Sequence, residues 1–327
     1  MTAVLVRKIL VTGGSGFIGS HVCDALVAEG HDVRCLDNFA TSTRRNIAQL
    51  EGRAAFTCVV GDVRSVSDCA EAVAGVDTVV HLAALGSVPR SIDNPLAAHA
   101  TNLTGFLNAL DAARVAKVGR FVFASSSSVY GDAADLPKRE AKTGLPLSPY
   151  AVNKAGNESY AGLYHRLYGI ETIGLRFFNV FGERQDPDGP YAAAIPSFIR
   201  SFLRHQTPRI HGDGLQTRDF TYVRNAVQAV LCAVCTPNPR CSGEVFNVAY
   251  GERTTLLELV DALRTELALI DPAIATLAVE HGAERVGEVR DSLADIGKAR
   301  QLLGYAPAVG LREGLRLAVP WYAANWR

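Results

Sequence analysis

A glycine-rich turn near the amino end constrains the fold of this chain more than any other feature. Gly13, Gly16 and Gly19 give the spacing G-x-x-G-x-x-G between a short apolar segment, 9–11, and an amphipathic one that stops near Gly30. Glycine permits the tight turn and a close backbone approach to a pyrophosphate, and a helix amino terminus offers unpaired N–H groups and the positive end of its dipole. The feature therefore predicts a strand–turn–helix unit that binds a dinucleotide.

Short apolar runs alternate with longer amphipathic ones through the first half of the chain. Runs without strict polar–apolar alternation are typical of strands covered on both faces, as in a parallel sheet. We predict an α/β fold with a Rossmann-type doubly wound parallel sheet and a smaller α/β carboxyl-terminal domain. The predicted strands are 9–11, 33–36, 56–60, 78–82, 121–124, 172–176 and 246–248, and the predicted helices follow the apolar stripes 18–26, 103–110 and 256–267.

The pattern loosens after about residue 178, where loops rich in Gly, Pro and Asp appear. We expect a nucleotide-binding domain over 1–178, a substrate-binding domain over 179–327, and a segment near 220–250 that returns to the first domain.

Asp37 ends the second predicted strand. A carboxylate at this place accepts hydrogen bonds from the adenosine ribose hydroxyls and repels a 2′-phosphate. Asn38 and Phe39 follow with no arginine beside the acid, which favours NAD over NADP. Asp62 and Val63, which follow the third strand, are expected near the adenine.

A tyrosine and a lysine share one face of another predicted helix. Ser148 and Pro149 suit a helix start, and Tyr150 and Lys154 are then i and i+4. An ammonium group and a nicotinamide cation both favour the phenolate, so we expect the pKa of Tyr150 to fall enough for it to act as a base. A structural Tyr/Lys pair is the alternative. The serine run 125–128 ends the fifth strand, where α/β sheets place ligands and where a hydroxyl could relay a proton.

Charge and cysteine content exclude several partners. The 327 residues include 33 Lys+Arg and 33 Asp+Glu, so the formal net charge is zero and no nucleic-acid partner is expected. No apolar run approaches the roughly 18–20 residues that cross a bilayer, so no membrane partner is expected either. Seven scattered cysteines are typical of a reduced, cytoplasmic protein.

Two further groups are interpreted as structural. Cys232 and Cys235 form a lone C-x-x-C pair in an apolar run, which we interpret as helix core, and we expect no metal site. We interpret His81, at the end of a buried strand, as a core histidine.

Together these motifs resemble the extended short-chain dehydrogenase/reductases, specifically nucleotide-sugar epimerases of the kind that act on UDP-N-acetylglucosamine. The resemblance covers nearly the whole chain. It implies that Tyr150 is the base, that Lys154 lowers its pKa and holds the nicotinamide ribose, and that Ser126 relays the proton. Ser125 and Ser127 remain alternatives for the relay. The resemblance rests on the glycine turn, Asp37-Asn38, 81–84, the serine run with Tyr130-Gly131, Tyr150 with Lys154, and 175–182.

The same resemblance implies NAD as the cofactor and a homodimer through helices near 96–115 and 149–168. The residues implied to bind NAD are Gly13, Gly16, Phe17, Ile18, Gly19, Asp37, Asn38, Asp62, Val63, Leu82, Ala83, Ala84, Asn102, Tyr150, Lys154 and Phe178.

Reactions of this family begin with hydride transfer from C4 of the sugar to NAD. A 4,6-dehydratase then needs an Asp-Glu pair where this chain has Ser127 and Ser128, and a uronic-acid decarboxylase carries Glu in place of Ser128. We therefore favour 4-epimerisation, in which the 4-keto sugar rotates and takes the hydride back on its other face. A reductase, a 4,6-dehydratase and a catalytically silent NAD-binding regulator are the alternatives.

The resemblance also implies a UDP-sugar substrate. Arg218 and Arg285 match the pyrophosphate-binding arginines of the family, whose planar guanidinium groups donate bidentately to phosphate; surface arginines are the alternative. Ser292 stands where epimerases restricted to glucose and galactose carry a bulky tyrosine. This favours UDP-GlcNAc/UDP-GalNAc, with UDP-Glc/UDP-Gal or the uronic acids also open. The implied substrate contacts are Gly86, Ser87, Ser126, Ser127, Tyr150, Asn179, Ala193, Arg218, Arg285 and Ser292.

Overall fold

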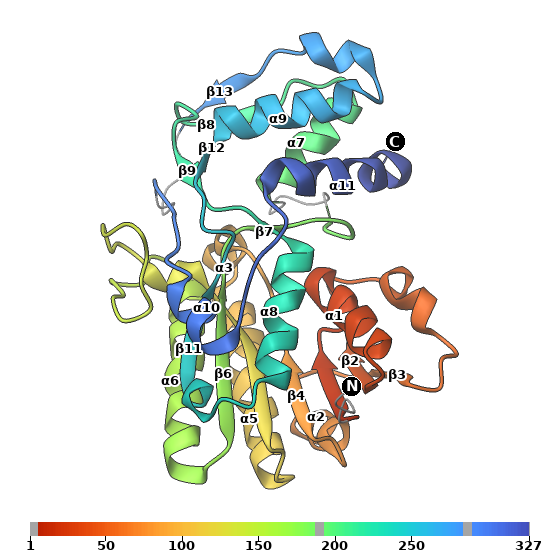
Figure 1. Cartoon of the computed structure of the whole chain (residues 1–327), viewed down its shortest axis with the longest axis vertical. Coiled ribbons are helices and arrows are strands. Elements are labelled where there is room, and N and C mark those ends of the chain that lie inside the picture. The colour runs from red at the N-terminus through yellow and green to blue at the C-terminus, as the bar shows by residue number, and fades with distance from the viewer. Residues whose placement is uncertain (1–5, 187–192, 284–289, 327) are drawn as a thin grey trace.

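A seven-stranded sheet, parallel throughout, organises the larger part of the molecule (Figure 1). The structure is a computed structural model that describes residues 6–186, 193–283 and 290–326. The strand order β11-β6-β5-β4-β1-β2-β3 reverses direction at β1, which confirms the doubly wound Rossmann-type prediction. The strands are β1 (Lys8–Thr12), β2 (Asp32–Asp37), β3 (Phe56–Val60), β4 (Thr78–His81), β5 (Arg120–Ser126), β6 (Glu171–Phe177) and β11 (Glu244–Val248).

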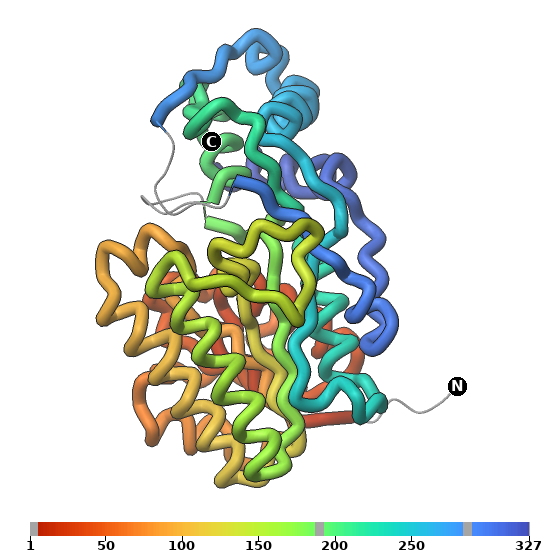
Figure 2. The backbone as a smooth tube through the Cα atoms, turned by 90° about the vertical axis from the view of Figure 1, so that its left-hand side faces the viewer, coloured from red at the N-terminus to blue at the C-terminus, as the bar shows by residue number. Residues whose placement is uncertain are grey.

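Helices cover both faces of this sheet because successive side chains of each strand point to opposite sides. On β1, Ile9 and Val11 belong to a core that also holds Val22 and Val230 of the helices on one face. Leu10 belongs to the core on the other face. Figure 2 shows the helices of that second face running side by side, α5 next to α6. The helices are α1 (Phe17–Ala28) and α8 (Val223–Cys235) on the first face, and α2 (Val66–Val73), α5 (Gly105–Val115) and α6 (Pro149–Tyr168) on the second.

A π-helical turn over Ala100–Thr104 precedes α5. The extra residue in this turn rotates the helix relative to the predicted stripe, so Phe106 and Leu110 are buried while Leu103 and Leu107 are only half-buried. The turn instead directs Asn102 into the protein, where it is buried. The apolar stripe thus predicts the helix correctly but its buried face only in part.

A second group of helices lies beyond the carboxyl ends of the strands, at the top of Figure 1. There α7, α9 and α11 pack on one another, and the Thr255–Glu258 capping box begins α9. Short strand pairs connect this group to the large sheet. The elements are β7 (Val180–Phe181), α7 (Ala194–Leu203), β8 (Arg209–His211), β9 (Thr217–Arg218), β10 (Thr221–Tyr222), β12 (Thr254–Thr255), α9 (Leu256–Ala268), β13 (Glu280–Gly282) and α11 (Leu311–Asn325). Helix α10 (Gly297–Leu303) packs instead against β11 and α8.

Two short helices, α3 (Val88–Asp93) and α4 (Pro95–His99), connect β4 to the π-helical turn. Within the described ranges, no helix is both long enough and apolar enough to span a membrane. All seven cysteines are free.

Candidate functional site

Two adjoining cavities lie at the carboxyl edge of the sheet, where α/β folds bind ligands. One, of about 600 Å³, is lined by the glycine turn and by Tyr150 and Lys154, and we call it the glycine cavity. The other, of about 1330 Å³, is lined by residues of the sheet edge and of the second helix group, and we call it the arginine cavity. The residues that line both are Phe17, Ala40, Thr41, Ser42, Gly86, Ser87, Asn179, Val180 and Gln185.

The glycine turn has the shape that a dinucleotide requires. Gly13 has a φ of +68°, and a Cβ there would lie 2.8 Å from the backbone of Ala83. A Cβ on Gly19 would overlap the carbonyl oxygen of Gly13. Helix α1 begins directly after Gly16, which has no side chain to cap it, so its first N–H groups are left for a ligand. The residues present therefore fit a pyrophosphate at the start of α1.

Asp37 lines the far side of the glycine cavity and is fixed by three hydrogen bonds. Its Oδ2 accepts from the backbone N–H of Ser15 at 3.0 Å, and its Oδ1 accepts from the backbone N–H of Phe39 and from Ser42 Oγ, each at 2.9 Å. The carboxylate is therefore held at the predicted ribose position before any ligand binds.

Asp62 supports this end of the cavity without lining it. It accepts a hydrogen bond from Asn38 Nδ2 at 2.8 Å, and its hydrogen-bonded ion pair with Arg64 lowers its pKa to about 2. Asn38, Val63 and Arg64 line the cavity instead. Asp62 is thus placed to orient Asn38.

Tyr150, Lys154 and Ser126 meet at the other end of the glycine cavity. Lys154 Nζ lies 5.8 Å from the centre of the Tyr150 ring and donates to the carbonyl oxygen of Ala124 at 2.8 Å. Ser126 Oγ accepts from both the backbone N–H and the hydroxyl of Ser128, at 3.1 and 3.0 Å. The three side chains predicted to act together come from β5 and α6, and the fold brings them to one place.

The protein's own groups raise the pKa of Tyr150, and the predicted fall, which includes the charge of the nicotinamide cation, stays a prediction. Burial raises the pKa of this phenol, and its hydrogen bond with Ser126 offsets only part of that rise. Burial also lowers the pKa of Lys154 to about 8. At neutral pH the pair is therefore a phenol beside an ammonium group, and ionisation of the phenol needs further positive charge in the cavity.

Two neighbouring side chains have structural partners. Ser125 Oγ donates to Glu158 Oε1 at 2.5 Å, so this alternative for the relay already has a partner other than Tyr150.

His81 is buried against Phe106 and Phe121 and forms a hydrogen bond with Thr12. Burial, together with the charge of Lys154, lowers the pKa of His81 to about 3. His81 is therefore a neutral core histidine, as predicted.

Several predicted ligand contacts do not line either cavity. Phe178 is buried against Tyr130, and its neighbour Phe177 faces the glycine cavity instead, because β6 ends at Phe177. Asn102 exchanges hydrogen bonds with the backbone of Leu85 and leaves the lining position to Thr101. The other predicted contacts outside both linings are Asp62, Ser127 and Ser292.

The remaining predicted residues line the cavities, except for one that lies outside the described residues. Gly16, Ile18, Leu82, Ala83 and Ala84 line the glycine cavity. Ala193 and Arg218 line the arginine cavity. Arg285 falls in 284–289, outside the described residues.

Most of the charged side chains that line the arginine cavity are arginines. Among the residues described there, Asp186 is the one acidic side chain, against a group of five arginines. Arg218 is fixed by donation from Nη1 to the carbonyl oxygens of Thr217 and Arg290, at 2.9 and 3.0 Å. No sequence pattern singles out the other four, because each is a lone arginine without a motif around it. The five are Arg45, Arg90, Arg184, Arg209 and Arg218.

Two residues at the junction of the cavities have strained backbones. Ser87 has a φ of 91° and Asn179 a φ of 34°, a region that side-chain-bearing residues rarely adopt. Asn179 is held there by donation from Nδ2 to the carbonyl oxygen of Asp219 at 3.2 Å. Such strain is typical of functional sites, where surrounding structure stabilises it.

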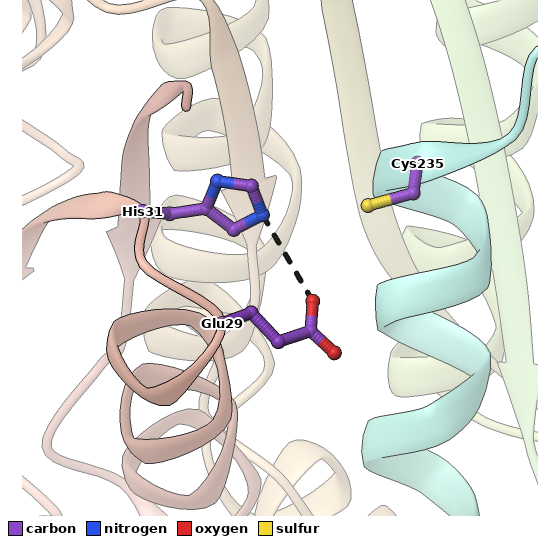
Figure 3. Close-up of side chains that lie close together, drawn as sticks. All are labelled: Glu29, His31 and Cys235. Atoms are coloured by element: carbon purple, nitrogen blue, oxygen red, sulfur yellow. Dashed lines mark ion pairs between the residues drawn. The ribbon is translucent and has the colours of Figure 1, made fainter. Parts of the chain in front are cut away.

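A separate cluster at the opposite edge of the sheet brings together groups that can ligate metals. A carboxylate oxygen of Glu29, a ring nitrogen of His31 and the thiol of Cys235 lie within 4.8 Å of one another (Figure 3). The backbone N–H of Arg7 donates to His31 Nδ1 at 3.3 Å, so the neutral ring carries its proton on Nε2, 3.9 Å from Glu29. A protonated nitrogen has no lone pair for a metal ion. Cys235 is exposed, so its predicted place in the core is wrong.

Comparison with known proteins agrees with these features. Residues 9–249 match the NAD dependent epimerase/dehydratase family. A UDP-glucose 4-epimerase from Mycolicibacterium smegmatis is 35% identical over 318 residues, which cover 96% of this chain and 98% of the relative.

Two solved structures are similar over nearly their full length. The UDP-N-acetylglucosamine 4-epimerase from Methanobrevibacter ruminantium, in complex with UDP-N-acetylmuramic acid, has a TM-score of 0.91 and 35% identity, with 98% of this chain and 99% of that chain covered. The UDP-glucuronic acid 4-epimerase from Bacillus cereus, in complex with UDP-glucuronic acid and NAD, has a TM-score of 0.88 and 32% identity, with 97% and 99% covered.

Proposed function

This chain belongs to the NAD dependent epimerase/dehydratase family, and we propose that it is a UDP-sugar 4-epimerase that uses NAD. One observation carries the proposal. The cavity that holds Tyr150, Lys154 and Ser126 shares its wall with a larger cavity lined by five arginines. A sugar at the junction would have its reacting carbon beside the tyrosine and its diphosphate among cationic side chains.

The chain's own residues would hold the cofactor along the glycine cavity. The first N–H groups of α1 would bind the pyrophosphate, Asp37 the adenosine ribose, and Lys154 the nicotinamide ribose. Bound NAD supplies a positive charge and a hydride acceptor that later returns the hydride. The glycine turn excludes side chains, and therefore bulk, from the place where the phosphates would lie.

Tyr150, Ser126 and Lys154 would divide the proton chemistry. Tyr150 would take the proton of the C4 hydroxyl and give it back, directly or through Ser126. Lys154 would stabilise the phenolate because its ammonium lies 5.8 Å from the ring centre. Removal of the proton and the hydride leaves a 4-keto sugar, and inversion at C4 follows when the sugar turns its other face.

The surroundings of Tyr150 favour epimerisation over dehydration. Elimination of water from C5–C6 needs a second acid near the sugar. In the described lining of the glycine cavity Asp37 is the one acidic residue, and it is committed to the ribose end. Glu158 follows Lys154 by one turn of α6, but its carboxylate already accepts hydrogen bonds from Ser125 and Arg176. A catalytically silent binding protein would have no need of a tyrosine beside a buried lysine in this cavity.

For the substrate we favour UDP-GlcNAc and UDP-GalNAc, with UDP-Glc/UDP-Gal or the uronic acids as further substrates. Arg218, together with Arg285, would bind the diphosphate, and Gly86, Ser87, Asn179 and Ala193 would surround the sugar. Ser292 donates through its backbone N–H to the carbonyl oxygen of Thr217, next to Arg218. Its small side chain would leave room for a 2-acetamido group.

We also infer a homodimer and two functional domains. Exposed apolar side chains gather on α4 and α6, among them Leu96, Val152, Leu163 and Leu167. Burying this face against a second copy would remove it from water. Residues 1–178, together with α8 and β11 from 220–250, would bind NAD, and the remainder of 179–327 would bind the UDP-sugar.

The experiment that tests the function is incubation of the purified chain with NAD and either UDP-GlcNAc or UDP-glucose, followed by proton NMR of the products. We expect the C4 epimer from both sugars, with the acetylated sugar turned over faster. A 4-keto-6-deoxy product would identify a dehydratase. Binding of NAD and UDP-sugar without any product would support the silent regulator.

A further inference from the structure

A half-buried carboxylate, that of Glu158, lies one helical turn beyond Lys154. Glu158 follows Lys154 at i+4 on α6, so the two side chains share one face of the helix. Its Oε1 accepts from Ser125 Oγ at 2.5 Å and from Arg176 Nε at 2.8 Å, and its Oε2 accepts from Arg176 Nη2 at 2.7 Å. Both carboxylate oxygens are thus bound by side chains of two neighbouring strands, β5 and β6.

The two α6 side chains dock on consecutive residues of β5. Lys154 Nζ donates to the carbonyl oxygen of Ala124, and Glu158 accepts from the hydroxyl of Ser125. The next residue is Ser126, the predicted proton relay. Tyr150 precedes Lys154 by one turn on the same helix. The two contacts of α6 with β5 therefore fix the distance between Tyr150 and Ser126.

Glu158 also balances charge around Lys154. The titratable groups that face this pocket are Tyr150 and Glu158 on α6, His81 on β4, Arg176 on β6 and Tyr130 after β5. Glu158 is the carboxylate among these groups, and its charge acts on Lys154. Burial lowers the pKa of Lys154, and Glu158 acts against that fall.

Arg176 is held from its other side as well. It lies 4.9 Å from the ring centre of Tyr130, and its Nη1 donates to the carbonyl oxygen of Glu140 at 3.1 Å. The carboxylate of Glu140 is occupied by the backbone N–H of Asn247 at 2.9 Å. Glu158 is therefore the carboxylate bound to Arg176 in this part of the described structure.

We propose that Glu158 is a positioning residue for the proposed reaction: it keeps Lys154 charged and fixes α6 to the end of β5, so that Tyr150 and Ser126 face each other. The effect of Glu158 on Lys154 does not depend on the proposed function, whereas its effect on catalysis rests on that function. Replacing the carboxylate by an amide of the same shape removes the negative charge that opposes the fall in the pKa of Lys154. Lys154 should then lose its proton at a pH lower by about one unit.

The direct test is NMR of the full chain labelled with ¹³C at lysine Cε, recorded over a pH series with and without NAD. The chain has six lysines, so the Lys154 signal can be assigned from a Lys154→Arg spectrum. We expect Glu158→Gln to lower the midpoint of the Lys154 titration by about one unit, and Glu158→Asp to restore most of it. An unchanged midpoint in Glu158→Gln would overturn the proposal.

Glu171→Gln is the matched control. Glu171 pairs with Arg120 at 2.7 Å, across the same two strands but at their opposite ends. It should leave the Lys154 titration unchanged. If Glu158→Gln does not fold, the double variant Glu158→Gln with Arg176→Gln removes the unpaired guanidinium as well. Its Lys154 should still titrate below the wild type, because Glu158 and not Arg176 is the charge that acts on Lys154.

Activity measurements separate this proposal from the proposed function. In Glu158→Gln the alkaline limb of kcat/KM for UDP-GlcNAc should move to lower pH by the same amount as the lysine titration. A merely structural role would lower thermal stability and leave both midpoints unchanged. If Lys154 shifts as expected while no sugar reacts even with the wild type, the proposed function fails and the role of Glu158 in charging Lys154 stands.

Discussion

Gly19→Ala tests whether the glycine turn is shaped for a dinucleotide. A Cβ at this position would overlap the Gly13 carbonyl oxygen and would lie 2.9 Å from both the Gly13 carbonyl carbon and the Gly14 Cα. Carbon atoms prefer separations of about 3.5–4.0 Å, so the turn would have to move by about 1 Å. The atoms in the way are backbone atoms, which cannot turn aside as a side chain can.

The expected cost follows from this displacement. Overpacking typically costs about 1–3 kcal/mol, and a backbone clash belongs at the upper end, so we expect about 3 kcal/mol less stability. A turn displaced by about 1 Å would also lose at least one hydrogen bond to a phosphate. Hydrogen bonds to charged groups are worth about 1.5–3 kcal/mol, so NAD should bind at least about tenfold more weakly.

The assay is titration calorimetry with NAD together with chemical denaturation. Gly119→Ala is the matched control, because a Cβ there meets its nearest atom, the Asp77 carbonyl oxygen, at an ordinary 3.7 Å. The control should bind NAD as the wild type does. If Gly19→Ala binds NAD with unchanged affinity and unfolds like the control, then close backbone packing is not what requires glycine in the turn.

Three further predictions address stability, assembly and specificity. Burial raises the pKa of Asp219 from 3.8 to about 7, so folding takes up a proton at this carboxyl between those two values. The contribution of Asp219 to stability should therefore be highest below about pH 4 and fall by about 4 kcal/mol as the pH rises to 7. Asp219→Asn should flatten that dependence in urea denaturation, and an equal slope in both proteins would contradict it. Leu163→Glu with Leu167→Glu should change the mass measured by light scattering from a dimer to one chain of 35.0 kDa, and an unchanged mass would exclude this face as the interface. Ser292→Tyr should lower kcat/KM for UDP-GlcNAc at least about tenfold and spare UDP-galactose, as loss of room for one substituent requires, whereas equal losses on both sugars would refute the gatekeeper role.

The fold could be predicted from the sequence because its signals are local. Each buried strand is a short apolar run, and the glycine turn lies between a strand and a helix as a dinucleotide site requires. Asp37 ends its strand, and Tyr150 and Lys154 share a helix face at i, i+4. Position in a strand or helix therefore sufficed to bring these three side chains to the glycine cavity.

Other features depend on contacts between distant segments. The choice between Phe177 and Phe178 turns on the residue at which β6 ends, and a shift of one residue reverses the side that a side chain faces. Asn102 lies outside the lining of the glycine cavity and bonds the backbone of Leu85, and the π-helical turn that carries it is not visible in the apolar pattern. The rise in the pKa of Tyr150 comes from burial, which its spacing from the lysine does not reveal. The Glu158–Arg176 pair joins α6 to β6 and has no sequence pattern of its own.

The central claim is that Tyr150 moves the proton of the sugar's C4 hydroxyl. The most direct measurement compares Tyr150→Phe with the wild type in NAD binding, UDP-GlcNAc binding and epimer formation followed by NMR. We expect the variant to bind both ligands within about threefold of the wild type and to form epimer at least about a hundredfold more slowly, because only the hydroxyl is removed. Epimerisation by Tyr150→Phe at the wild-type rate would contradict it.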